Sequence, residues 1–158
     1  MNPNPDRAVL RIFEEVLADF AFLFGDPRVP EDLPVLVGTA YLACLPYRAS
    51  VAGYIAFGVP ERLALEIAAN TLGVDATDPG VPLRAQDAVK EVASVIGGHL
   101  ATALERPEQP VTLFPPQIFP LDRADWDRLR TDPSTRCFAV NDQPVILRVG
   151  PDAGGAST

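Results

Sequence analysis

The stretch Leu83–Glu105, LRAQDAVKEVASVIGGHLATALE, decides how this chain of 158 residues folds. Its apolar residues recur with the period of an α-helix, so one side of that helix should be buried. They are Val89, Val92, Ile96, Leu100 and Ala103. A second set of acidic, polar and small residues follows the same helical spacing: Asp87, Glu91, Ser94 and Gly98. This second set, here called the motif face, should lie together on another side of the helix, apart from the buried stripe.

Two adjacent glycines, Gly97 and Gly98, interrupt this helix beyond its middle. A glycine inside a helix costs up to about 1 kcal/mol relative to alanine, so a pair of them requires a reason. We expect another backbone segment to come close to the helix at this pair.

The segments on either side of this helix alternate between helical and strand patterns. Before it, the sequence predicts a helix from Asp6 to about Phe24, a proline-rich loop over 26–34 without regular pairing, strands at Val35–Leu45 and Ser50–Gly58, and a helix from Pro60 to just before Gly73. After it, the sequence predicts a strand at Val111–Phe114 with an extension at Ile118–Phe119, and then a short surface helix or a helical turn over 122–130 with Trp126 and Leu129 facing inward. Strands at Arg136–Val140 and Pro144–Val149 should follow and turn at Asn141–Asp142.

Helices and strands in this order, with short connections between most strands, predict an α+β fold. We expect a largely antiparallel sheet of about five strands with the helices packed on one face. Residues 1–150 should form a single domain. The tail 151–158 carries no large apolar side chain and should be disordered. At least one of the apolar strands Val35–Leu45 and Val145–Val149 should lie at a sheet edge. Pairing with a second copy would cover that edge, so we expect a homodimer.

Composition excludes several classes of protein. The net charge of −8 argues against nucleic acid as a partner, because phosphates attract Lys and Arg. No apolar run reaches the roughly 18 residues that a membrane span needs, and the N-terminus lacks the pattern of a signal peptide. Cys44 and Cys137 lack disulfide or zinc spacing, so they should be buried thiols in a reducing compartment. We therefore expect a cytoplasmic protein that itself binds no metal or other cofactor.

The motif face and its surroundings resemble the CheX/CheC/FliY family of chemotaxis phosphatases, and CheX in particular. The family signature is Asp or Ser, Glu four residues later, Asn three further, and a proline a little over twenty residues on. Asp87, Glu91 and Pro116 match it, and Ser94 stands in the place of the Asn. The segments GYIAFGVPERLALEIAANTLG at 53–73 and VTLFPPQIF at 111–119 are similar too. The resemblance as a whole spans about residues 35–119.

The resemblance implies a CheX-like fold and a role in two-component signalling. In the family, the motif helix docks on the CheY-like receiver domain of a response regulator, and the phosphatase hydrolyses the aspartyl phosphate of that receiver. The Glu pairs with a receiver Lys, the Asn amide orients the attacking water, and the Mg²⁺ belongs to the receiver. By this resemblance, Glu91 and Ser94 hold the catalytic positions, while Asp87, Glu91 and Gly98 contact the partner.

Ser94 leaves the activity open, because serine is shorter than asparagine and offers one hydroxyl in place of an amide. Three readings follow: a weak phosphatase, a non-catalytic interaction module of the same fold, or a dimeric scaffold whose motif face is merely solvated. Asn70 offers a relocated amide in principle, but its place near a helix end favours a structural role. His99, the only histidine, is expected at the surface rather than as a general base.

Overall fold

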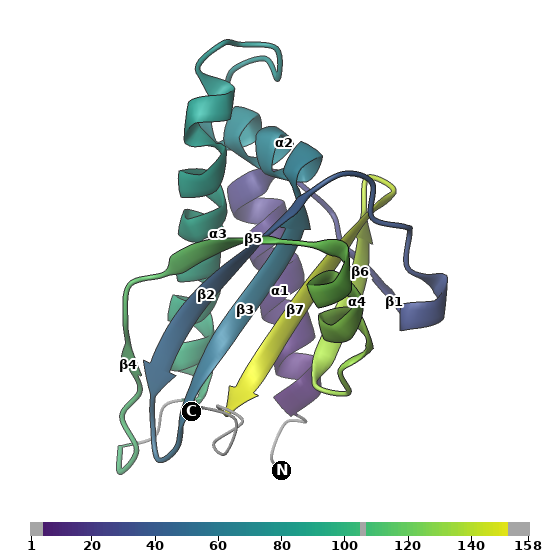
Figure 1. The fold of residues 1–158 in the computed structure, drawn as a ribbon. Helices are drawn as coiled ribbons and strands as arrows, with labels where there is room; N and C mark the ends of the chain where they lie inside the picture. Colours follow the sequence, from purple (N-terminus) through teal and green to yellow (C-terminus); the bar gives the residue numbers. More distant parts are fainter. Residues whose placement is uncertain (1–4, 105–106, 152–158) are drawn as a thin grey trace.

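A computed structural model describes residues 5–104 and 107–151 of the chain (Figure 1). The helices are α1 (Pro5–Ala21), α2 (Glu61–Leu72), α3 (Val81–Leu104) and α4 (Arg123–Thr131), and a short 3-10 helix spans Pro30–Asp32. The strands are β1 (Asp26–Arg28), β2 (Ala40–Arg48), β3 (Ala52–Pro60), β4 (Thr112–Leu113), β5 (Gln117–Leu121), β6 (Thr135–Val140) and β7 (Gln143–Pro151). The tail expected to be disordered lies outside the described residues, except for Pro151, which ends β7.

The described strands form one antiparallel sheet. Their order is β1-β6-β7-β3-β2-β4, and β5 also pairs with β2. The α+β class with a largely antiparallel sheet is therefore confirmed, although the sheet has seven strands rather than about five. One added strand is β1, where Pro27 lies opposite Phe138 in a segment expected to be an unpaired loop. Pairing is possible there because a proline is tolerated in an edge strand.

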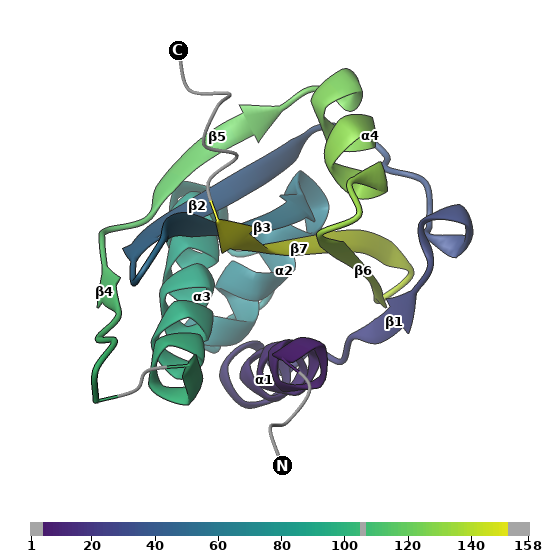
Figure 2. The ribbon, with the colours of Figure 1, turned by 90° about the horizontal axis from the view of Figure 1, so that it is seen from below.

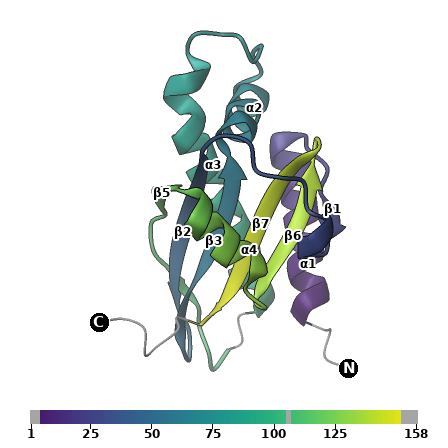
Figure 3. The same ribbon diagram turned by 45° about the vertical axis from the view of Figure 1, so that its right-hand side comes forward.

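Helices cover both faces of the sheet. α1, α2 and α3 lie on one face, and α4 lies on the other (Figures 2 and 3). The expectation of helices on one face thus holds for three of the four. α4 takes the opposite face because Trp126, only 1% exposed, packs with Leu129 against Cys137 and Ile146. Gly58 of β3 leaves room there, since a Cβ at that position would lie 2.6 Å from Ile146 Cγ1.

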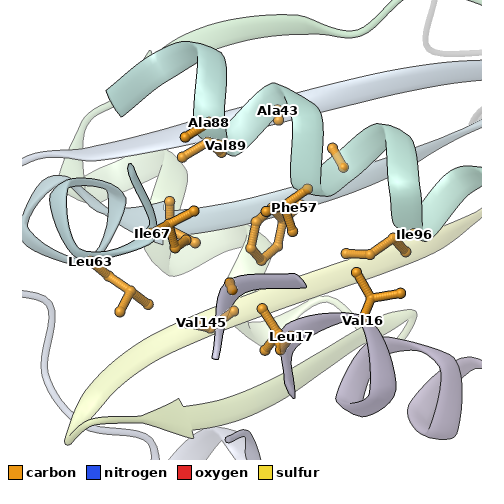
Figure 4. Close-up of a cluster of buried hydrophobic side chains, with 14 of the residues drawn as sticks. Val16, Leu17, Ala43, Phe57, Leu63, Ile67, Ala88, Val89, Ile96 and Val145 are labelled. Carbon is orange, nitrogen blue, oxygen red and sulfur yellow. The ribbon is translucent and has the colours of Figure 1, made fainter. Parts of the chain in front are cut away.

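The main core lies between the sheet and the three helices (Figure 4). Successive residues of a strand point to opposite faces, so alternate residues of the central strands reach this core. On β3 they are Ile55, Phe57 and Val59. α1 contributes Phe13, whose ring lies edge-on to Phe57 with centroids 5.8 Å apart. Burying each large apolar side chain contributes about 1.5–3 kcal/mol, which holds the helices against this face.

β2 is displaced along the sequence from its expected position. It begins at Ala40 rather than Val35, and residues 35–39 form an irregular segment. The strand then continues to Arg48, through a stretch expected to be a turn. It continues because the carbonyl of Pro46 accepts a hydrogen bond from the backbone N–H of Phe114 at 3.0 Å. A proline lacks only its own donor, so its acceptor still joins the sheet.

Three described non-glycine residues have positive φ, and each lies where the chain reverses or a helix ends. Asn141 and Asp142, with φ of 49° and 61°, connect β6 to β7. The predicted hairpin is therefore confirmed, and these two residue types tolerate the left-handed region well. Phe22, with φ of 56°, follows α1 and ends it before the expected Phe24. The N–H of Leu23 then bonds back to the Leu17 carbonyl at 3.0 Å.

The strand order removes the edge-strand argument for a homodimer. β2 lies between β3 and the strands β4 and β5, and β7 lies between β6 and β3. Both long apolar strands are thus paired on both sides, so the expectation that one lies at an edge is wrong. The strands at the edges of the described sheet are short, and β1 and β5 carry Pro27 and Pro120. Short, proline-containing edges resist further pairing.

Candidate functional site

Helix α3 lies on the β2 side of the sheet, where it contacts α1, α2 and β2 (Figure 1). Its buried apolar side chains form one stripe: Val81, Ala85, Ala88, Val89, Val92, Ala93, Ile96 and Leu100. The predicted stripe is confirmed except at its last member. Ala103 is exposed because it borders an open groove beside Arg11 of α1.

The motif face lies on the side of α3 turned away from the buried stripe. At 3.6 residues per turn, the two sets of side chains leave the helix in roughly opposite directions. Asp87 and Glu91 are exposed, and Ser94 and Gly98 are half-buried. The helix therefore brings the four residues together on one accessible surface.

The two carboxylates of the motif face have different surroundings. Asp87 Oδ1 lies 3.4 Å from Lys90 Nζ in an ion pair one turn along the helix. The side chain of Glu91, in contrast, makes no ion pair or hydrogen bond within the part of the chain that the structure describes. An exposed ion pair contributes little to stability, but it does balance the charge of Asp87. The carboxylate of Glu91 remains available to a cation from outside the chain.

Ser94 lies one helical turn from Glu91 on the same surface. It is half-buried, so its hydroxyl is accessible from the outer side of α3. A serine hydroxyl both donates and accepts hydrogen bonds, yet its oxygen lies closer to the backbone than the amide of an asparagine would. A water bound to Ser94 would therefore sit nearer the helix than one bound to an amide.

The two adjacent glycines of α3 have different surroundings. A Cβ at Gly97 would lie 2.0 Å from Leu45 Cδ2 of β2, a separation that real Cβ atoms essentially never show. A Cβ at Gly98 would meet nothing within 4 Å. The close approach expected for the pair exists only at Gly97, and it involves a side chain rather than a backbone. This contact brings α3 onto β2 and so fixes the direction in which the motif face points.

Pro116 completes the sequence signature from a separate part of the fold. It is half-buried in the link between β4 and β5, and both of these strands contact α3. The Phe114–Pro46 hydrogen bond holds this link against β2. Pro116 is thereby held beside α3, which carries the other three positions of the signature.

Asn70 and His99 have the surroundings predicted from the sequence. Asn70 Nδ2 donates a hydrogen bond to the Ala21 carbonyl at 2.9 Å and so joins the ends of α2 and α1. Because this amide is engaged within the fold, Asn70 supplies no relocated catalytic amide. His99 is exposed on the rim of the groove between α3 and α1.

Metal and thiol chemistry find no support in the described residues. Residues 5–104 and 107–151 contain no group of three or more side chains able to hold a metal ion. Cys44 is half-buried and Cys137 is buried, and both are free thiols. Burial raises the pKa of each thiol, which keeps both mostly protonated at neutral pH. In this part of the chain, no helix has the length and apolar character needed to cross a membrane.

Known proteins share both the sequence pattern and the fold. A family model described as "Chemotaxis phosphatase CheX" matches residues 41–128, and no curated protein matches the chain. Among solved structures, CheX from Desulfovibrio desulfuricans is 16% identical with a TM-score of 0.68, over 94% of this chain and 99% of that one. The CheX–CheY–BeF3–Mg²⁺ complex from Borrelia burgdorferi gives 16% and 0.62, over 92% and 96%. FliY from Thermotoga maritima gives 14% and 0.55, over 95% and 92%.

Proposed function

This chain belongs to the CheX family of chemotaxis phosphatases, and from that premise we propose that it binds a CheY-like receiver domain through the motif face of α3. The observation that carries the proposal is Glu91, an exposed carboxylate without a partner among the described residues, at the centre of that face. The Borrelia burgdorferi complex supports the choice of partner, because it holds a protein of the same fold bound to CheY. A cytoplasmic location belongs to the same proposal.

The proposed reaction is hydrolysis of the aspartyl phosphate carried by the receiver. The receiver contributes Mg²⁺, which neutralises charge on the phosphoryl group, and a Lys beside that group. Glu91 would pair with this Lys and so place α3 over the receiver active site. What remains is to hold a water in line with the phosphorus, and Ser94 is the side chain that α3 presents one turn from Glu91.

Ser94 makes the reaction slow in this proposal. A water displaced by about 1 Å from its productive position lowers a rate by roughly a hundredfold. Serine holds its water closer to the helix than an amide does, which produces a displacement of that kind. The same observation favours a second candidate function, in which the chain is an interaction module of the same fold that binds a receiver without turnover. A dimeric scaffold with a solvated motif face is the remaining reading.

The test of the docking surface is the substitution Glu91→Ala. We expect it to weaken receiver binding about thirtyfold or more while the fold is unchanged, because truncating one partner of a desolvated charge pair costs about 2–5 kcal/mol. The measurement is a calorimetric or fluorescence titration with a CheY-like receiver activated by beryllofluoride and Mg²⁺.

The matched control is Glu31→Ala, since Glu31 is also exposed and lies in the short 3-10 helix on the far side of the sheet from α3 (Figure 1). Asp122 and Asp125, two other acidic residues away from α3, are unsuitable as controls because both stabilise α4. Asp122 caps α4 by accepting a hydrogen bond from the Asp125 backbone N–H at 2.8 Å, and Asp125 pairs with Arg128. Equal losses from Glu91→Ala and Glu31→Ala would show a general charge effect and would remove the special role of α3.

A further inference from the structure

Gly98 has no structural explanation within the described chain. Its neighbour Gly97 is required by Leu45, but a Cβ at Gly98 would enter open space. The backbone there is ordinary helix, so no unusual φ requires a glycine either. A helix interior favours alanine over glycine, so this position lowers the stability of α3 without any internal gain. A partner that packs directly on the backbone of α3 would explain it.

The surface beside Gly98 is a groove between α3 and α1. On the α3 side it is bordered by Val95, Gly98, His99 and Thr102, and on the α1 side by Arg11 and Glu15. The Thr102 hydroxyl donates a hydrogen bond to the Gly98 carbonyl of the same helix at 3.0 Å, so it is engaged within α3. The groove is therefore open at Gly98, with one side continuous with the motif face.

The α1 wall of this groove continues the acidic character of the motif face. Glu15 and Asp19 are exposed on it, and Asp19 borders the same hollow as Val95 and His99. Arg11 lies 3.9 Å from Glu15 and balances part of that charge. Asp19, like Glu91, has no ion pair within the described chain. A partner with basic side chains would complement such a surface.

We propose that the receiver's contact surface extends from the motif face across Gly98 into this groove. Gly98 is the point where the receiver comes closest to the backbone of α3, and Asp19 of α1 makes a second contact with a basic side chain of the receiver. The inference rests on the proposed function, since it takes the partner to be a receiver domain. It adds α1 to the recognition surface, so receivers are distinguished by their charge opposite Asp19 as well as by the Lys that meets Glu91.

The experiment measures stability and binding of the full chain for four variants. Gly98→Ala should raise Tm by about 2–4 °C, because alanine is the better helix residue. It should also weaken binding of the beryllofluoride-activated receiver about tenfold, since an added methyl overfills a close contact. Asp19→Asn should weaken binding about threefold and reduce its salt dependence. Glu14→Gln, on α1 but outside the lining of the groove, should change neither. Glu91→Ala reports on the proposed function itself.

Each outcome either supports or overturns the extended surface. A rise in Tm together with weaker binding for Gly98→Ala supports it. Wild-type binding by Gly98→Ala and Asp19→Asn overturns it, and if Glu91→Ala still loses affinity, the proposed function stands. A fall in Tm for Gly98→Ala also overturns it, because the glycine would then serve the chain's own packing. If the wild-type chain binds no receiver, both the proposed function and this extension fail.

Discussion

The absence of a side chain at Gly97 lets α3 pack closely on Leu45 of β2, and Gly97→Ala tests this close packing. The new Cβ would lie 2.0 Å from Leu45 Cδ2, whereas ordinary contacts begin near 3.4 Å, so the two atoms must move apart by about 1.4 Å. Leu45 is only 2% exposed and has little room to move. Overpacking of this kind costs about 1–3 kcal/mol, and alanine returns up to about 1 kcal/mol of helix propensity. We expect a net loss of about 1–2 kcal/mol.

Thermal unfolding of the variant measures this loss. For a chain of this size, about 1–2 kcal/mol corresponds to a fall in Tm of roughly 2–8 °C. Gly98→Ala, the adjacent position, is the matched control and should raise Tm instead. A double-mutant cycle with Leu45→Ala should show coupling of at least about 1 kcal/mol, because the new methyl then occupies space that Leu45 has left. A Gly97→Ala variant as stable as the wild type, with no coupling to Leu45→Ala, would refute the reasoning.

Two further predictions concern the rest of the fold and the assembly. Asn70→Ala removes the hydrogen bond to the Ala21 carbonyl, so urea unfolding should show a free energy of unfolding lower by about 0.5–1.5 kcal/mol, and an unchanged value would exclude the bond as a stabilising link. A homodimer remains a prediction, although the strand order removes the edge-strand argument for it. Sedimentation equilibrium at micromolar concentration should give twice the chain mass of 17.0 kDa, and a clean species of 17.0 kDa would end that prediction.

The sequence predicts the elements whose signal is local and periodic. α3 and its buried stripe follow from a repeat that extends over several helical turns, and the last hairpin follows from Asn141–Asp142. β1 and β5 could not be predicted as separate strands, because Pro27 and Pro120 lower the strand signal and only the neighbouring strands decide the pairing. The sequence also predicts too early a start for β2, because the apolar residues just before Ala40 have the composition of a strand, although 35–39 are irregular in the structure.

The sequence likewise predicts only part of the candidate site. Helical spacing alone predicts that Asp87, Glu91 and Ser94 share a surface. Spacing does not show that Lys90 balances Asp87 and leaves Glu91 without a partner among the described residues, because that depends on side-chain conformation. The different surroundings of Gly97 and Gly98 depend on β2, which lies about fifty residues earlier in the chain. The contribution of α1 to the groove beside the motif face requires the tertiary fold for the same reason.

The central claim is that α3 presents a receiver-docking face on which only the water-orienting amide is missing. The most direct measurement is the time course of phospho-receiver decay under saturating Mg²⁺ with the wild type, Ser94→Asn and Ser94→Ala. The account predicts that the wild type accelerates decay little and that Ser94→Ala is almost the same. Ser94→Asn should be tenfold faster or more, because the amide then holds the water in line. Fast decay with the wild type that Ser94→Ala abolishes would show that serine itself positions the water. A Ser94→Asn variant that binds the receiver yet stays inactive would contradict the claim that the amide alone is missing.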